Sequence, residues 1–353
     1  MGGSLGMALG RYGVARERWG YDHNMNATIE AKSRDAVDRT GELAQALADA
    51  DLVILALPVR QTEIMLQQIA PFLSPGVVVT DVGSTKKNIV DAMEKWLPSD
   101  VFAVGGHPMA GSERAGIEAA DPLLLENAVY LLTPGKGASP QAVQKIEKLV
   151  NAIKAHPVVL DVEKHDRLVA LVSHLPHLLA VALVHTVNGS RSEKDLLLSL
   201  AGGGFRDTTR IAMGDASVWY DIFTTNTCYL REALHSFQEE IGSLWALLEK
   251  EQEEEARHSL ERARNFRHSL PYPGKGMLPE LFELIIMLPD VPGVIGKVAT
   301  LVGEAGFNIS EIEMLRNRED EGGSIRLAFS QLEERNGALE VLEKQGYRCW
   351  KKG

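Results

Sequence analysis

A histidine between glycines and a proline is the side chain of this sequence best placed to move a proton. His107 lies in the segment GGHPMAGSE (residues 105–113), directly after the apolar run VFAV (residues 101–104). A neutral imidazole at a strand end can accept a hydroxyl proton while a hydride leaves the substrate, because its pKa lies near working pH. A lone histidine is more often structural, but the position at the crevice edge of a sheet favours chemistry.

Two further imidazoles lie three residues apart, His174 and His177 in SHLPH (residues 173–177), and hence on one face of a predicted helix. Zinc would need a third and a fourth ligand at a recognisable spacing, and none is present. We therefore expect no metal here and interpret the pair as substrate contacts or core hydrogen bonds.

Two arginines follow a glycine run in GGGFRDTTR (residues 202–210) of an acidic chain. The guanidinium fork matches the geometry of a carboxylate, so Arg206 and Arg210 are candidates for binding an anionic substrate. A solvated basic helix end is the alternative, and it applies to Arg206 more than to Arg210, which we expect to point toward Trp219 on the same helical stretch.

The chain begins MGGSLGMAL (residues 1–9), which is similar to the second half of a dinucleotide fingerprint. In that motif a helix N-terminus binds the pyrophosphate through backbone N–H groups. Gly2 fits the last glycine, with Gly3 and Ser4 beside it, whereas the earlier glycines and their strand are missing. We expect weakened NAD binding and exposed edges on the neighbouring strands if the chain begins here. A flexible terminus is the alternative.

Polar and turn residues at later strand ends complete the predicted cofactor site. Asp22, about twenty residues beyond the glycine turn, is placed to accept hydrogen bonds from the ribose hydroxyls, which favours NAD over NADP. Leu57 and Pro58 end the apolar run at residues 51–58, and Asp81 ends the run at 77–81. All lie where the carboxyl ends of parallel strands form a ligand crevice.

The order of these segments predicts an α/β fold. From about residue 14 to 161, apolar runs of strand length alternate with amphipathic helices, as in a Rossmann-like, doubly wound parallel sheet, here without its first strand. Helical periodicity then continues to residue 269. The predicted domains are a dinucleotide-binding domain at 1–162, an all-helical dimerisation or substrate domain at 163–270, a linker at 271–280 and a further domain at 281–353.

The patterns predict that the last domain contains, in order, a strand at 283–288, a helix at 294–305, strands at 308–314 and 324–329, a helix at 338–345 and a further strand near Tyr347. This order is ferredoxin-like.

Composition limits the partners. A formal net charge of -11 disfavours nucleic acid and anionic membranes, and 45% hydrophobic residues suffice for two or three cores. Cys228 and Cys349 form no disulfide framework, which suits the cytoplasm. The N-terminus lacks the features of a secretory signal. The apolar stretch at residues 168–184 is interrupted by histidines and a proline, so we expect a buried helix and no membrane span.

Together these segments resemble the prephenate dehydrogenase family. The resemblance covers nearly the whole chain and is carried by GGSL (2–5), Asp22, DVGSTK (81–86), HPMAGSE (107–113), SHLPH (173–177) and GFRDTTR (204–210). It implies NAD-dependent oxidative decarboxylation of prephenate to 4-hydroxyphenylpyruvate in tyrosine biosynthesis. It also implies a homodimer joined through the helical domain.

The resemblance assigns roles to individual residues. His107 would hydrogen-bond the ring hydroxyl and assist its deprotonation, and Ser84 would orient His107 or the same hydroxyl. Arg210 would bind a carboxylate, with His177, His174 and Arg206 as further contacts. Glu113 and Asp207 would pair with Arg210 to gate the pocket.

The C-terminal segments LPDVPGVIG (288–296) and GFNI (306–309) resemble an ACT domain. The resemblance implies an amino-acid effector, with feedback by tyrosine the expectation. Asp290 would meet the α-amino group, and Gly293 and Asn308 would contact the rest of the ligand. A purely structural dimerisation module is the alternative.

Three other functions compete. Arogenate dehydrogenase acts on a substrate that has an amino group where prephenate has a keto group, and the sequence barely separates the two. A catalytically silent, amino-acid-responsive regulator would explain the missing strand but not the presence of His107, Ser84 and Arg210. A generic β-hydroxyacid dehydrogenase would offer a lysine base in the helical domain, and none has a matching motif.

Overall fold

The computed structural model describes residues 1–111, 116–189, 194–270, 281–315 and 323–352. Glu113 and the predicted linker at 271–280 therefore lie outside the described residues. The chain divides into two compact units, Met1–Gly276 and Met277–Gly353.

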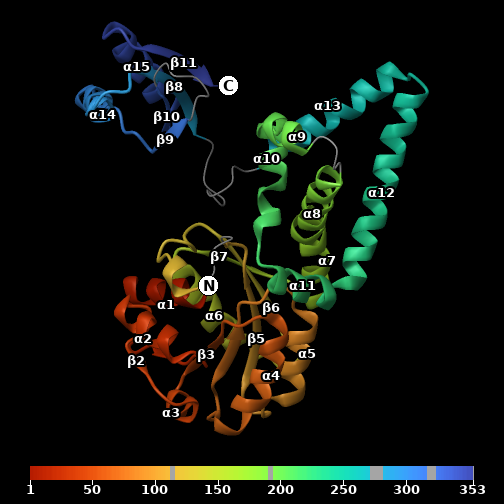
Figure 1. Ribbon diagram of the computed structural model, residues 1–353. Coiled ribbons are helices and arrows are strands. Elements are labelled where there is room, and N and C mark those ends of the chain that lie inside the picture. Colours follow the sequence, from red (N-terminus) through yellow and green to blue (C-terminus); the bar gives the residue numbers. More distant parts are fainter. Residues whose placement is uncertain (112–115, 190–193, 271–280, 316–322, 353) are drawn as a thin grey trace. The chain divides into compact units, whose positions relative to one another are not determined.

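A five-stranded sheet is the centre of the first unit (Figure 1). Its strands in spatial order are β3 (Leu52–Leu55), β4 (Val78–Asp81), β5 (Phe102–Pro108), β6 (Val129–Pro134) and β7 (His156–Val159). All neighbours run parallel except β5 and β6, which are antiparallel. The expectation of a wholly parallel sheet is therefore wrong. A parallel connection needs a crossover of a dozen or more residues, usually a helix, and the described part of 109–128 holds only the 3-10 turn Ile117–Ala119.

Two shorter strands form a separate parallel sheet, β1 (Trp19–Gly20) and β2 (Arg39–Thr40), connected through α2 (Met25–Ser33). β3 is an edge strand of the five-stranded sheet, as expected. Asp22 follows β1 by two residues, so the predicted ribose contact lies at the carboxyl end of this small sheet.

Helices cover both faces of the main sheet. α1 (Gly2–Arg11) and α6 (Pro140–Ala152) pack with one set of core side chains, which includes the fully buried Val104 and Leu132. On the other face lie α3 (Leu43–Ala48), α4 (Val59–Ile69) and α5 (Lys87–Trp96), which pack around Val79. The doubly wound arrangement is confirmed.

The rest of this unit is helical, as expected (Figure 1). Its elements are α7 (Val162–Val169), a π-helical segment (Ala170–His174), α8 (Leu175–Asn188), α9 (Lys194–Leu200), α10 (Gly203–Thr209), a 3-10 turn (Arg210–Met213), α11 (Ala216–Thr225), α12 (Thr227–Glu249) and α13 (Glu253–Ser269). Asp161 caps the N-terminus of α7, and its carboxylate accepts a hydrogen bond from the Lys164 N–H. The helix widens directly before Pro176, because proline donates no hydrogen bond and its ring crowds the carbonyl four residues earlier.

The apolar stretch at 168–184 differs from the expectation of a short, buried helix. Within the described residues, the continuous helix Val162–Asn188 is long and apolar enough to cross a membrane, with a hydropathy of 1.8, and 33% of its most apolar window is buried. Core helices of proteins without a membrane span pass the same test. Leu168, Leu171, Val172 and Leu183 are exposed, so this helix has an uncovered apolar face.

The second unit has the predicted ferredoxin-like topology. Its elements are β8 (Phe282–Leu288), α14 (Val294–Glu304), β9 (Glu311–Leu315), β10 (Gly323–Phe329), α15 (Leu332–Lys344) and β11 (Arg348–Lys352). The strands pair antiparallel in the order β11-β8-β10-β9. Gly293 caps α14 with φ +84, a left-handed conformation that suits glycine.

Candidate active site

His107 lies on the last but one residue of β5 and is almost completely buried. Two glycines precede it because the strands approach closely there: a Cβ on Gly106 would lie 2.5 Å from the Asp81 carbonyl oxygen, and one on Gly105 would lie 2.3 Å from Thr133 Oγ1. These glycines therefore serve packing, and the strand that carries His107 is held firmly at its carboxyl end.

A chain of hydrogen bonds runs from His107 into the helical region. Its Nδ1 lies 2.9 Å from His165 Nε2, and His165 Nδ1 lies 2.8 Å from Asp166 Oδ1. His165 and Asp166 are buried neighbours on α7. The resemblance implied that Ser84 orients His107 or the substrate hydroxyl. Among the described residues the His107 ring has a hydrogen bond to His165 and none to Ser84, which is half-buried, so the contact with the hydroxyl stays a prediction.

Asp166 is itself held by the start of a helix. Its two carboxylate oxygens accept the backbone N–H groups of Lys86 and Lys87 at 2.8 and 2.9 Å, at the N-terminus of α5. The positive end of the helix dipole stabilises a carboxylate there. Asn226 Nδ2 also donates to the Asp166 backbone carbonyl at 2.8 Å.

A fully buried ion pair lies under the same strand ends. The Lys86 ammonium contacts the Asp81 carboxylate and donates to the Gly106 carbonyl at 2.6 Å. Asp81 also accepts the N–H groups of Gly83 and Gly106. Burial lowers the pKa of Lys86, and Asp81 opposes that shift. The prediction that Asp81 contacts the cofactor is corrected accordingly, since its carboxylate is fully buried and bound by protein groups.

The His107 imidazole is held in its neutral form. Burial lowers its pKa well below the ordinary value, and the nearby His165, Lys86 and His174 oppose a further positive charge. A neutral imidazole can accept a proton from a substrate hydroxyl.

The two imidazoles of the SHLPH segment are also buried. His174 Nδ1 lies 3.1 Å from Asn226 Nδ2, and burial lowers the pKa of His174 to about 4. His177 stacks on Trp219, with ring centroids 3.5 Å apart and planes inclined by 13°, and burial lowers its pKa. His174 Nε2 and His177 Nδ1 are buried without a hydrogen-bond partner in the described part of the chain. Such atoms are suited to contact a polar ligand.

The predicted anion-binding residues lie outside this buried cluster. Arg206, Asp207 and Arg210 are exposed. Arg206 Nε donates to the Ala201 carbonyl at 3.0 Å. Arg210 starts the 3-10 turn after α10 and is separated from α11, which carries Trp219, so the expectation of one helical stretch is wrong.

The predicted phosphate site lies at the N-terminus of α1. A Cβ on Gly2 would lie 2.8 Å from Ala56 Cβ, which brings this helix end against the carboxyl end of β3. The first N–H groups of a helix have no partner within it, so those of Gly2 and Gly3 fit a pyrophosphate. Ser4 is buried, and its hydroxyl accepts the Asp121 N–H at 3.0 Å.

The other predicted cofactor residues surround that edge. Asp22 is exposed, with Oδ1 accepting the Asn24 N–H at 2.8 Å, and could still bind ribose hydroxyls. Leu57 is half-buried, and Pro58 is exposed at the N-cap of α4. These residues fit a dinucleotide across the carboxyl ends of β1 and β3.

Direct contacts join the sheet to the helical region. Arg60 on α4 forms an ion pair with Asp221 at 3.3 Å and donates to Thr224 at 3.0 Å. Thr85 Oγ1 lies 2.9 Å from Thr225 Oγ1. Within the described residues, no group of three His, Cys, Asp or Glu side chains is arranged to hold a metal ion.

A doubly wound nucleotide-binding sheet with a neutral, buried histidine at its ligand edge defines a dehydrogenase that uses a dinucleotide. Comparison with known proteins narrows this class. Residues 5–159 match the nucleotide-binding domain of prephenate dehydrogenase, and residues 161–262 match its dimerization domain. The chain belongs to the prephenate dehydrogenase family.

Individual relatives agree with this assignment. The prephenate dehydrogenase of Bacillus subtilis (strain 168) is 34% identical over 97% of this chain and 93% of its own length. A crystal structure of prephenate dehydrogenase from Aquifex aeolicus, in complex with hydroxyphenyl propionate and NAD+, has a TM-score of 0.72 and 32% identity and covers 76% of this chain and 94% of that one. Arogenate dehydrogenase of Synechocystis has a TM-score of 0.67 and 28% identity over 75% and 95% of the two chains.

Four residues of the buried network were not predicted: His165, Asp166, Lys86 and Asn226. The sequence carries a signal for His165 and Asp166, the apolar periodicity of α7. Val162, Val169 and Ala170 mark the apolar face of α7, and His165 and Asp166 fall on that face. Titratable side chains at core-facing positions of a helix need partners.

Proposed function

We propose that this enzyme oxidises prephenate with NAD and releases carbon dioxide and 4-hydroxyphenylpyruvate. The proposal is carried by His107, a neutral imidazole at the ligand edge of a nucleotide-binding sheet, in a chain of this family. NAD, when bound, accepts the hydride from the ring carbon that bears the hydroxyl.

The residues of this chain would manage the proton. His107 accepts the hydroxyl proton as the ring carbon becomes a carbonyl, which would otherwise acquire an unfavourable positive charge. When carbon dioxide leaves, the electron pair of the broken carbon–carboxylate bond stays in the ring and the carbonyl oxygen becomes a phenolate. His107 then returns its proton to that oxygen. Aromatisation favours this second step.

The two carboxylates of prephenate need cations or N–H donors to bind them. Arg210 is the proposed partner of one carboxylate, with Arg206 as a weaker second contact, because both lie in the helical region that follows the buried cluster. His174 and His177 offer buried nitrogens to the ring or its substituents. Asp207 and Glu113 are proposed to pair with Arg210 and gate the pocket.

Substrate preference is tested by kcat/KM for prephenate and for arogenate, with NADH formation as the readout. We expect prephenate to be preferred, because the Bacillus relative is a prephenate dehydrogenase. A preference for arogenate would instead align the chain with the Synechocystis relative. Turnover of neither substrate would favour an amino-acid-responsive regulator.

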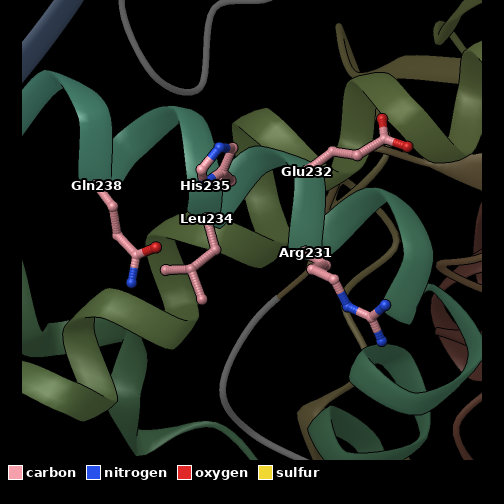
Figure 2. Close-up of a pocket in the computed structure, with 5 residues that line it drawn as sticks. All are labelled: Arg231, Glu232, Leu234, His235 and Gln238. Carbon is pink, nitrogen blue, oxygen red and sulfur yellow. The ribbon is translucent and has the colours of Figure 1, made fainter.

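We propose a homodimer joined through the helical region. The exposed apolar face of Val162–Asn188 includes Leu171 and Val172. A pocket of about 350 Å³ on α12 is lined by Arg231, Glu232, Leu234, His235 and Gln238. Figure 2 shows these five side chains on the helix. Burying an apolar face against a second copy removes it from water.

The dimer is tested by sedimentation of two variants. Leu171→Glu should shift the enzyme toward monomer, because a carboxylate would be buried at the apolar interface. Ile64→Glu, on the exposed surface of α4, is the matched control and should remain dimeric. A dimer that survives Leu171→Glu would place the interface elsewhere.

The second unit is proposed to be an ACT domain that binds an amino acid, with tyrosine as the expected effector. A cavity of about 150 Å³ lies beside the start of α14, with Asp290, Gly293, Met314 and Ile325 in its lining. Asp290 can meet an α-amino group and Gly293 can offer backbone contacts. Asn308 is exposed and is not among the lining residues, so its predicted contact loses support.

Calorimetric titration of the whole enzyme with tyrosine tests this proposal. Asp290→Asn should weaken binding about tenfold or more, because it removes a charge-assisted hydrogen bond. Asn308→Ala should bind as the wild type does. Tyrosine that fails to bind the wild type would leave a structural role for the unit.

A further inference from the structure

We propose that His165 and Asp166 act as a positioning pair that fixes the tautomer of His107 and so directs its proton-accepting Nε2 to the substrate. The inference rests on the proposed function for its catalytic consequence, but the tautomer itself can be measured without any substrate.

The direction of each hydrogen bond follows from the acceptor at the end of the chain. The ionised Asp166 carboxylate only accepts, so His165 Nδ1 must carry a proton and donate to it. A His165 ring with one proton then presents Nε2 as an acceptor. His107 Nδ1, 2.9 Å away, must therefore donate.

The consequence falls on the other nitrogen of His107. A neutral imidazole carries one proton, and with that proton on Nδ1 its Nε2 holds a lone pair. None of the described residues forms a hydrogen bond to this Nε2. The ring is thus prepared as a base, with its acceptor on the side away from α7.

The position of Asp166 is fixed by several hydrogen bonds, so it can determine the direction of the hydrogen bonds from His165 to His107. It is buried and accepts three N–H donors, from Lys86, Lys87 and His165. Three donors and the N-terminus of α5 therefore face its two carboxylate oxygens, which act as acceptors. A carboxylate that remained protonated could donate to His165 and reverse the chain of bonds.

The pair also supports the proton once His107 has accepted it. An imidazolium at His107 donates from Nδ1 to His165, and the carboxylate behind His165 offsets the new positive charge. His165, Lys86 and His174 disfavour a positive charge on His107, so the Asp166 carboxylate behind His165 is the group that offsets it.

Nitrogen NMR of the ring-labelled wild-type enzyme is the decisive measurement, with His107→Asn used to assign the His107 signals. We expect Nδ1 of His107 to carry the proton and Nε2 to be unprotonated at neutral pH, in the absence of substrate. A proton on Nε2 would overturn the proposal.

Two substitutions of His165 connect the tautomer to turnover. His165→Gln keeps an oxygen acceptor near the position of Nε2, whereas His165→Met fills similar space without one. We expect His165→Met to lower kcat about 100-fold with KM for NAD unchanged, and His165→Gln to recover most of that loss. Lys164→Gln, an exposed neighbour on α7, is the control.

The outcomes distinguish failure of the positioning role from failure of the proposed function. Equal kcat in the wild type and a folded His165→Met variant would overturn the positioning role, as would a folded His165→Gln variant with Nε2 of His107 protonated. Absence of prephenate turnover in the wild type, with the expected tautomer, would refute the proposed function alone. If His165→Met fails to fold, the wild-type spectrum and the glutamine variant still decide.

Discussion

Acid should lower the free energy of unfolding of this enzyme through protonation of His174, and the substitution His174→Asn should remove this contribution. His174 is buried, accepts a hydrogen bond from Asn226 at Nδ1, and has a pKa of about 4 in the folded chain. In the unfolded chain its pKa is about 6.5. Above pH 6.5 neither state binds the proton, and below it the unfolded state binds it first, so stability falls as the pH drops toward 4.

The size of the effect follows from the two pKa values. Between pH 7.5 and pH 5, linkage predicts a loss of about 2 kcal/mol from this group. His174→Asn retains a side-chain acceptor for Asn226 and does not titrate. The free energy of unfolding of the wild type, minus that of the variant, should therefore be about 2 kcal/mol smaller at pH 5 than at pH 7.5.

Equilibrium unfolding in urea, followed by tryptophan fluorescence at both pH values, measures this difference, because four of the five tryptophans lie in the first unit. His258→Asn, on the exposed surface of α13, is the control and should follow the wild type. If the difference between wild type and His174→Asn stays constant from pH 7.5 to pH 5, His174 titrates alike in both states and the reasoning is refuted.

Three further substitutions test the site. Lys86→Met leaves the buried Asp81 without its cation and should cost about 3–5 kcal/mol in urea unfolding. Much of this loss should be regained in the double variant with Asp81→Asn, which removes the charge and keeps an oxygen acceptor for the buried N–H groups; a loss below about 1 kcal/mol for Lys86→Met would contradict the pairing. His107→Asn should lower kcat about 100-fold or more while KM for NAD changes little, and unchanged kcat would remove its role as base. Arg210→Ala should raise KM for prephenate about tenfold or more, and an unchanged KM would move the carboxylate site elsewhere.

Much of the fold could be predicted from local patterns. The runs at 51–58 and 77–81 are apolar on both faces, and β3 and β4 lie within them. The ferredoxin-like order of the second unit was also found, although β9 begins three residues later than expected, at Glu311. The antiparallel pairing of β5 and β6 was missed, because strand direction depends on the connection between them and not on the composition of either strand.

The candidate site residues that the sequence indicated are those with a local signature. His107, His174 and His177 were singled out by their glycine and proline neighbours. The partners of His107 were missed because they act at long range: 58 residues separate it from His165, and Asp166 lies 80 residues from the N–H that it accepts at Lys86. Such pairs have no spacing rule, and only the apolar face of α7 gave a clue.

The bond between β5 and α7 also limits how this enzyme can be recombined. A chimaera that exchanges the nucleotide-binding domain at residue 162, for instance to alter cofactor preference, would take its equivalent of His107 from another parent but keep this chain's His165 and Asp166. Crossovers placed after α7, beyond Val169, would inherit base and partners together. The natural unit of exchange in this chain is thus one helix longer than its nucleotide-binding domain.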